Sequence, residues 1–442
     1  MSSAISQSVA AQKTFFIETW GCQMNDLDTQ RMSGHLKLRG YRRVNDESSA
    51  DLILLNTCSI REKSEHKMFT RLGYLRELKQ QKGIRIGVCG CVAQQEGEAI
   101  LSRAPFVDFV IGPGNVGHLD SVLDGDTRVA VDFPQDRRYD YLSLDRSSAV
   151  RAQVTIIEGC NKNCTFCIVP TTRGREVSRP FDDILCEVEH AISTGRGEIE
   201  LLGQTVNAYT CPSSGRDFAD LLRNVAGLAG VHRLRFITSH PAEVTSGMIG
   251  AIRDHDNISR FLHLPVQSGS SSVLRRMKRL YTRERYLEIV AEIRREVPDV
   301  LFSTDIIVGF PGETEKDFAE TLSLLEEVRF GSFFAFKYSP RPGTAAPRIG
   351  SPVDDAIASE RLVRLFALQE SIEQETLRNY LGTTQEVLYE GPSRHDEAMA
   401  SGKSDHNWTV NFSVPARPEV GTMVQVLIRE VRHHSLRGEA VT

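Results

Sequence analysis

The sequence lacks the features of several common protein classes. No apolar run approaches the ~20 residues of a membrane span, and residues 1–13 have neither the basic start nor the apolar core of a secretion signal. The formal net charge is −5 at pH 7, so the chain has no overall basic surplus for nucleic acid. We therefore expect a cytoplasmic protein without a membrane contact, in which any nucleic-acid contact comes from local patches.

Nine of the 442 residues are cysteine, and in a reducing compartment they indicate metal binding or catalysis rather than disulfides. Three of them form the pattern C-x-x-x-C-x-x-C at Cys160, Cys164 and Cys167, here called the central triad. Three thiolates on a 4Fe-4S cluster leave one iron open for another ligand. The alternative is a structural zinc site, which needs four protein ligands, but no second C-x-x-C half follows nearby. The spacing favours an open iron–sulfur cluster.

The first part of the chain alternates apolar runs with helical patterns, which predicts a Rossmann-like parallel sheet with strands at 14–19, 51–56, 84–89 and 106–111. Cys22, Cys58 and Cys91, here called the N-terminal triad, each follow the end of a different predicted strand. Ligands bind at this edge of open α/β sheets, so the three thiols are expected to meet there as a second metal site. The alternative is three ordinary buried cysteines, the role that we expect for Cys89 within its strand.

A second alternation follows a charged linker at about 124–148. Six β/α units fit a partial (β/α)6 barrel, with strands expected at 153–157, 198–202, 234–238, 261–264, 301–308 and 332–336. The central triad follows the first of these strands, at the face where barrel enzymes hold their active sites. Polar loops share that face, so we expect a ligand pocket formed by residues 203–207, 239–241, 267–270 and 304–305.

The last part of the chain changes pattern again. After a helix at about 355–381, a small β-barrel is predicted from short strands at 385–389, 408–412, 424–430 and 436–441. Its net charge from Arg378 onward is −1, from 7 Lys and Arg against 8 Asp and Glu. A solvated surface is one interpretation. The other is an RNA-binding surface, for which the candidates are Lys403, Trp408, Arg429, Arg432, His433, His434 and Arg437.

Several stretches together resemble the methylthiotransferase family of radical S-adenosylmethionine (SAM) enzymes, most closely its MiaB type. The resemblance covers nearly the whole chain and is carried by residues 21–25, 56–58, 90–94, 159–167, 172–180, 202–209 and 281–284. It implies a methylthiotransferase N-terminal domain at 12–128, a radical SAM core at 146–376 and an RNA-binding TRAM domain at 378–442.

The resemblance also implies two 4Fe-4S clusters. The central triad would hold the cluster whose open iron chelates SAM, and reduction of that cluster would cleave SAM to a 5'-deoxyadenosyl radical. Such a radical is needed because carbon 2 of adenine is an unactivated C–H. The N-terminal triad would hold an auxiliary cluster that carries sulfur. The resemblance further implies cofactor-binding positions at Phe166, Glu198, Gln204, Ser239, Thr304 and Asp305.

The implied reaction adds a methylthio group to carbon 2 of N(6)-(dimethylallyl)adenosine at position 37 of tRNA. The implied partners are the anticodon stem-loop of tRNA, a reducing electron donor and a sulfur donor, and the protein is expected to act as a monomer. Three alternatives stay open. They are a methylthiotransferase acting on threonylcarbamoyladenosine in tRNA, one acting on a ribosomal-protein aspartate, and an electron-transfer iron–sulfur protein with an RNA-binding tail.

Overall fold

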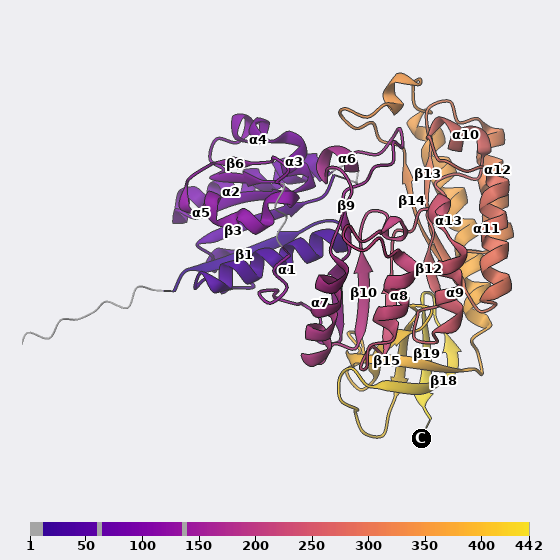
Figure 1. Cartoon of the computed structure of the whole chain (residues 1–442). Coiled ribbons are helices and arrows are strands. Elements are labelled where there is room, and N and C mark those ends of the chain that lie inside the picture. The colour runs from indigo at the N-terminus through magenta and orange to yellow at the C-terminus, as the bar shows by residue number, and fades with distance from the viewer. Residues whose placement is uncertain (1–11, 60–63, 135–138, 442) are drawn as a thin grey trace, which may run out of the picture. The chain divides into compact units, whose positions relative to one another are not determined.

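The computed structural model describes residues 12–59, 64–134 and 139–441, so part of the predicted linker, at 135–138, lies outside the described residues. The chain forms two compact units (Figure 1). Unit 1 runs to Ser147 and includes Thr171–Gly174, and unit 2 contains Ser148–Pro170 and Arg175–Thr442. Among the described helices, none is long and apolar enough to cross a membrane. The boundaries of the three expected domains stay predictions.

Unit 1 is built on a six-stranded parallel sheet in the order β2-β1-β3-β4-β5-β6. Every residue of β3 (Leu52–Thr57) is buried, as expected for a parallel strand covered on both faces. The other strands are β1 (Thr14–Thr19), β2 (Arg42–Arg43), β4 (Arg85–Gly90), β5 (Phe109–Ile111) and β6 (Val129–Ala130). The predicted parallel α/β fold is confirmed, and β6 is an additional strand within the stretch predicted as a linker.

Alternate residues of β3 pack into two different apolar clusters, one on each face of the sheet. Ile53 and Leu55 belong to one cluster, and Leu52 and Leu54 belong to the other. This division follows from the two-residue period of a strand. The helices of unit 1 are α1 (Gln23–Leu38), α2 (Ser64–Lys82), α3 (Cys91–Glu96), α4 (Glu98–Arg103) and α5 (Leu119–Asp124).

Unit 2 contains two three-stranded parallel sheets, β7-β10-β11 and β12-β13-β14, connected by a bridge between Leu234 and Ile258. These six strands form the predicted partial barrel: β7 (Arg151–Thr155), β10 (Glu198–Leu202), β11 (Arg233–Phe236), β12 (Phe261–His263), β13 (Leu301–Val308) and β14 (Ser332–Lys337). A short antiparallel pair, β8 (Ile157–Glu158) and β9 (Val177–Ser178), flanks the cysteine loop.

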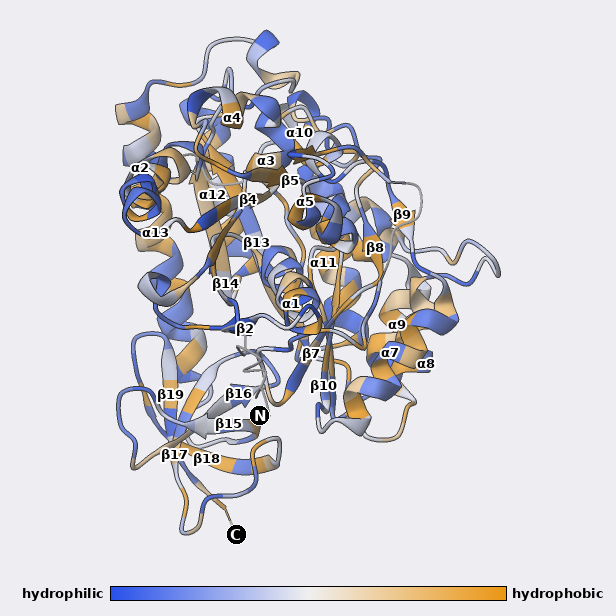
Figure 2. Ribbon diagram, turned by 90° about the vertical axis from the view of Figure 1, so that its left-hand side faces the viewer, coloured by the Kyte–Doolittle hydropathy of each residue, from blue (hydrophilic) through white to orange (hydrophobic). Residues whose placement is uncertain are grey.

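Amphipathic helices cover the partial barrel. Figure 2 shows orange and blue residues alternating along α7 (Phe181–Ser193) and α8 (Phe218–Ala226), whose apolar side chains are buried. The remaining helices are α6 (Val169–Thr172), α9 (Ser246–Asp254), α10 (Ser271–Arg276), α11 (Arg283–Glu296), α12 (Glu315–Val328) and α13 (Asp355–Arg378).

The chain ends in a closed five-stranded barrel in the order β15-β16-β17-β19-β18. Its strands are β15 (Thr384–Pro392), β16 (Ala400–Ser404), β17 (Thr409–Ser413), β18 (Met423–Val431) and β19 (Ser435–Ala440). The predicted small barrel is confirmed, but β16 was not expected because its residues are small and polar. A Cβ atom on Gly402 would lie 2.1 Å from the carbonyl oxygen of Leu388, so the close approach of β15 and β16 requires glycine there.

Candidate iron–sulfur sites

The N-terminal triad lies at one edge of the sheet of unit 1. Cys22 precedes α1, Cys58 follows β3, and Cys91 begins α3 directly after β4. Strands β1, β3 and β4 are parallel neighbours, so their carboxyl ends meet. A Cβ atom on Gly21 would lie 2.8 Å from the Cβ atom of Cys58. The structure thus brings together three cysteines that are far apart in sequence, and their role as ligands stays a prediction.

The thiols of this triad influence one another. A hydrogen bond with Cys58 lowers the pKa of Cys22 to about 6 against the opposing effect of burial, and the charge of Arg173 lowers it further. Burial raises the pKa of Cys91, while the charge of Arg173 and a hydrogen bond with it act in the opposite direction. Cys89 is fully buried in an apolar cluster, as predicted.

Asn25, in the first turn of α1, holds the loops around the N-terminal triad together. Its Nδ2 donates a hydrogen bond to the carbonyl oxygen of Thr57 at 3.0 Å, and its Oδ1 accepts one from Cys22 Sγ at 3.7 Å. Gly90, directly before Cys91, adopts a φ of +89°, and a Cβ atom there would lie 2.4 Å from the Thr57 carbonyl oxygen. Only glycine therefore allows this close packing of the two strand ends.

The central triad lies in a loop of unit 2 that follows β8. The amide of Lys162 donates to Cys160 Sγ at 3.4 Å, and the hydroxyl of Thr205 lies 3.5 Å from the same sulfur. Burial raises the pKa of Cys167 to about 12, and the neighbouring thiols of Cys164 and Cys160 also raise it. The three thiols are thus close to one another and to the loop that follows β10, at the carboxyl ends of the strands.

A half-buried arginine contacts the central triad. Arg279 Nη1 donates to Cys164 Sγ at 3.4 Å, its Nη2 donates to the carbonyl oxygen of Pro265 at 3.0 Å, and its Nε donates to the hydroxyl of Tyr281 at 2.9 Å. Sequence reasoning missed this residue because the basic run at 275–285 gives no indication of which side chain turns inward. Arg279 places a positive charge beside the thiols.

Most of the predicted cofactor-binding residues lie on the same side of unit 2 as the central triad. Gln204 Oε1 accepts a hydrogen bond from the amide of Gly159 at 2.6 Å, which ties the loop after β10 to the start of the cysteine loop. Ser239 is buried in the loop after β11. Thr304 and Asp305 lie midway along β13, and Phe166 packs beside the apolar cluster of unit 2 that includes Met277 and Phe310. Their contact with a cofactor stays a prediction.

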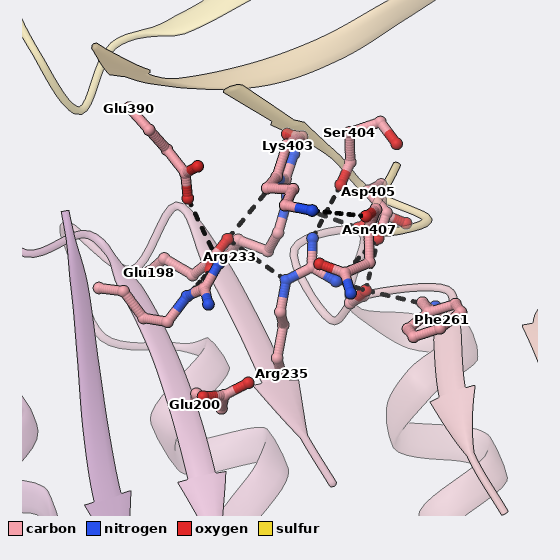
Figure 3. Close-up of polar contacts among 12 residues, drawn as sticks. Glu198, Glu200, Arg233, Arg235, Phe261, Glu390, Lys403, Ser404, Asp405 and Asn407 are labelled. Carbon is pink, nitrogen blue, oxygen red and sulfur yellow. Dashed lines mark hydrogen bonds and ion pairs between the residues drawn. The ribbon is translucent and has the colours of Figure 1, made fainter. Parts of the chain in front are cut away.

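Glu198 is the exception. It is the first residue of β10 and lies at the opposite end of that strand from Gln204. Its carboxylate is buried and pairs with Arg233 and Arg235 (Figure 3). It also pairs with Arg151. Burial alone would raise the pKa of Glu198, but the charges of these arginines hold the pKa below its usual range. The structure therefore contradicts the predicted cofactor-binding role, because the carboxylate lies at the wrong end of the strand and is already paired.

The same arginines join the terminal barrel to the amino ends of the strands. Arg233 Nη1 donates to the carbonyl oxygen of Lys403 at 2.9 Å (Figure 3). Arg235 donates to the carbonyl oxygens of Ser404 at 2.8 Å and Asp405 at 3.0 Å. Both arginine side chains are almost fully buried. Within unit 2, the terminal barrel is thus docked on the partial barrel through buried polar contacts.

Several residues considered for RNA binding have other contacts. Trp408 is 6% exposed and belongs to the barrel core, so the structure contradicts its expected role as a stacking surface. His433 and His434 stack on each other and pair with Glu370 and Glu373 of α13. Lys403 donates a hydrogen bond to the hydroxyl of Thr409. Arg429 and Arg432 form exposed ion pairs with Glu439 and Glu430, respectively. The side chain of Arg437 is exposed.

Family models match three parts of the chain. The model described as Uncharacterized protein family UPF0004 matches residues 14–112, the Radical SAM superfamily model matches residues 154–325, and the TRAM domain model matches residues 378–441. The first match contains the N-terminal triad and the second contains the central triad.

Curated relatives match over nearly the full length. The tRNA-2-methylthio-N(6)-dimethylallyladenosine synthase of Aeromonas salmonicida (strain A449) is 45% identical over 439 residues, which cover 97% of this chain and 92% of the relative. The enzyme of the same name from Haemophilus influenzae (strain PittGG) is 46% identical over 439 residues, with 96% and 92% covered. This chain belongs to the tRNA-2-methylthio-N(6)-dimethylallyladenosine synthase family. The family expected from the cysteine motifs is confirmed.

Solved structures share the fold of this synthase-family chain. The radical S-adenosylmethionine methyltransferase TsrM from Kitasatospora setae, solved with cobalamin and a [4Fe-4S] cluster, has a TM-score of 0.55 at 13% identity, covering 85% of this chain and 80% of that one. The cobalamin-dependent radical enzyme OxsB, solved with aqua-cobalamin and S-adenosylmethionine, has a TM-score of 0.52 at 12% identity, with 81% and 56% covered. At this identity the likeness shows the fold alone.

Proposed function

We propose that this protein is a methylthiotransferase that adds a methylthio group to carbon 2 of N(6)-(dimethylallyl)adenosine at position 37 of tRNA. The observation that carries the proposal is the 45–46% identity, over 439 residues, to synthases named for this product. The presence of one cysteine triad in each unit supports it, because the reaction needs both SAM cleavage and a sulfur carrier.

We propose a 4Fe-4S cluster at each triad, with SAM bound at the central one. All six cysteines are free thiols, and thiolates are the preferred ligands of iron–sulfur clusters. Three thiolates can bind three irons of a four-iron cluster and leave the fourth iron open for another ligand. When bound, these clusters supply the electron for SAM cleavage and the sulfur for transfer.

Side chains of unit 2 fix the loop that carries the central triad. Arg279 donates a hydrogen bond to Cys164 Sγ at 3.4 Å, which places a positive charge beside the proposed cluster site. Gln204 fixes the start of the cysteine loop through the Gly159 amide. We propose that SAM contacts residues of the cysteine loop, of the loops after β10 and β11, and of β13: Phe166, Gln204, Ser239, Thr304 and Asp305.

We propose that the terminal barrel binds the anticodon stem-loop of tRNA. The match to the TRAM domain model supports this, and Arg437 is an exposed cation of the barrel that suits a phosphate contact. A reducing electron donor and a sulfur donor must come from outside the chain. We also propose that the protein acts in the cytoplasm as a monomer; the proposed tRNA substrate supports the location.

The proposal is tested by mass spectrometry of tRNA nucleosides from cells with and without this protein. We expect the 2-methylthio derivative of N(6)-(dimethylallyl)adenosine to disappear from the deletion strain, with the unmethylthiolated nucleoside in its place. Wild-type protein should restore the product, and a Cys58→Ala variant should not. An unchanged nucleoside would reject the proposal. If the deletion strain instead loses methylthiolation of threonylcarbamoyladenosine or of a ribosomal-protein aspartate, that molecule is the substrate of this protein.

A further inference from the structure

An arginine from a distant part of the sequence reaches the N-terminal triad. Arg173 follows the central triad in the chain, but its segment, Thr171–Gly174, belongs to unit 1. The side chain is 5% exposed. Its Nη2 donates a hydrogen bond to Asp28 Oδ2 at 2.7 Å and another to Asn25 Oδ1 at 3.2 Å. Both acceptors are buried residues of α1, the helix that begins directly after Cys22.

The contact with Asn25 connects the guanidinium to the triad. The oxygen that accepts from Arg173 also accepts the hydrogen bond from Cys22 Sγ, and the amide of the same side chain donates to Thr57, next to Cys58. The guanidinium of Arg173 also forms a hydrogen bond with the side chain of Cys91. A single side chain therefore influences all three strand ends that carry the triad.

Asp28 faces two cations. Arg31, on the same helix, lies 3.5 Å from one carboxylate oxygen, and Arg173 lies 2.7 Å from the other. These contacts hold the buried guanidinium of Arg173 beside the first turns of α1, close to the triad. A positive charge fixed in a buried site favours negative charge on a neighbouring group, because the interaction is stronger there than in water.

We propose that Arg173 is a positioning residue of the auxiliary cluster: it fixes Asn25 against Cys22 and supplies the positive charge that favours the reduced, more negative state of the cluster. The proposal rests on the proposed function, because it takes the N-terminal triad as the ligands of that cluster. The physical basis is general, since net charge, hydrogen bonds near the sulfurs and burial set the reduction potential of iron–sulfur clusters. A purely structural ion pair with Asp28 is the competing explanation.

The test uses the full-length protein with all three central-triad cysteines replaced by alanine, so that only the auxiliary cluster remains. In this background we compare Arg173→Met, Arg173→Lys and Asp28→Asn by iron content and by a redox titration followed by electron paramagnetic resonance. We expect Arg173→Met to disfavour the reduced form about tenfold, equivalent to a midpoint about 59 mV lower for one electron. Arg173→Lys should recover most of this change.

Asp28→Asn separates the two explanations by the sign of its effect. It removes a negative charge and leaves Arg173 in place, so the proposal requires the midpoint to rise, opposite to the change in Arg173→Met. A structural ion pair predicts loss of stability in both variants without opposite shifts, and that result would overturn the proposal.

If Arg173→Met fails to fold, the two remaining variants decide. The proposal is overturned if the midpoint potential does not rise in Asp28→Asn. It is also overturned if the midpoint potential of Arg173→Lys falls by the full ~59 mV expected for Arg173→Met. Absence of iron from the background protein with native Arg173 would overturn it together with the proposed function. Absence of a shift in a protein that keeps its iron would reject the role of Arg173 alone.

Discussion

Replacing Glu198 by glutamine removes the carboxylate that three buried guanidinium groups share. Glu198 Oε2 lies 3.3 Å from Arg235 Nε and 3.5 Å from Arg233 Nη1, and Oε1 contacts Arg151. At an effective dielectric constant of about 20, an ion pair about 4 Å apart gains about 4 kcal/mol before desolvation. Removing one partner of a buried pair costs about 3–5 kcal/mol, and we expect Glu198→Gln to lower the free energy of unfolding of unit 2 within this range.

The loss should depend on pH in a defined direction. The neighbouring arginines hold the pKa of Glu198 below its usual range in the folded protein. Such a group contributes stability that is fully present above the pKa of glutamate in the unfolded chain, about 4.3, and is lost as the pH falls through the folded pKa. The difference between wild type and Glu198→Gln should therefore be constant from about pH 6 to 8 and shrink in acid.

Urea unfolding, followed by the transition of unit 2, measures this difference. Glu200→Gln is the control, because Glu200 lies on the same strand, is also buried, and accepts its hydrogen bond from the neutral Gln153 at 3.1 Å. Glu200 interacts with Arg151 through its charge, whereas Glu198 contacts Arg151 directly. We expect the control to cost about 1 kcal/mol. Equal small losses in both variants would refute the role of Glu198 in the buried network. A stable Glu198→Gln protein that fails to cleave SAM would restore the cofactor-binding role.

Three further outcomes follow from the two triads and the docked barrel. Replacing the central triad by alanine should abolish 5'-deoxyadenosine formation and leave about half of the iron bound, because each triad holds one cluster; retained 5'-deoxyadenosine would reject the assignment. Cys58→Ala should stop methylthiolation but keep 5'-deoxyadenosine formation, as liquid chromatography of both products would show, whereas an unchanged product would leave Cys58 as core packing. Arg437→Ala should weaken tRNA binding and reduce the slope of the logarithm of the binding constant against the logarithm of salt concentration by about 1. Arg429→Ala is the control, because the charge of Arg429 is paired with Glu439. Equal slopes in the two variants would place the phosphate contact on another residue.

The sequence predicts convergence of the N-terminal triad for a simple physical reason. In a parallel sheet all strands run in one direction, so residues that follow neighbouring strands lie at one edge, however far apart they are in sequence. Cys22, Cys58 and Cys91 follow β1, β3 and β4, which are adjacent in the structure. No comparable rule identifies Arg173 or Arg279, because a long side chain on a loop can turn inward or outward, and only the packing around it decides which.

The strand-direction rule also explains the error at Glu198. Strand β10 runs from Glu198 to Leu202, so Gln204 lies beyond its carboxyl end and Glu198 lies at its amino end. The two side chains therefore serve opposite ends of the strand. Strand β16 was not predicted from the sequence, for a different reason. Its sequence, Ala-Ser-Gly-Lys-Ser, lacks β-branched and aromatic residues, and glycine is selected there by the 2.1 Å approach that a Cβ atom would make to Leu388.

The docked barrel changes what a truncation can show. From the sequence alone, removal of the chain from about Arg378 onward is expected to separate RNA binding from SAM cleavage, since the terminal barrel is a distinct module. In the structure, however, Arg233 and Arg235 donate to backbone carbonyls of residues 403–405, and both guanidinium groups are buried beside Glu198. Truncation would expose these two guanidinium groups and remove their acceptors. This loss would destabilise the partial barrel at the amino ends of its strands. Loss of SAM cleavage in a truncated protein would therefore report damage to unit 2, so single surface substitutions such as Arg437→Ala are the sharper test of RNA binding.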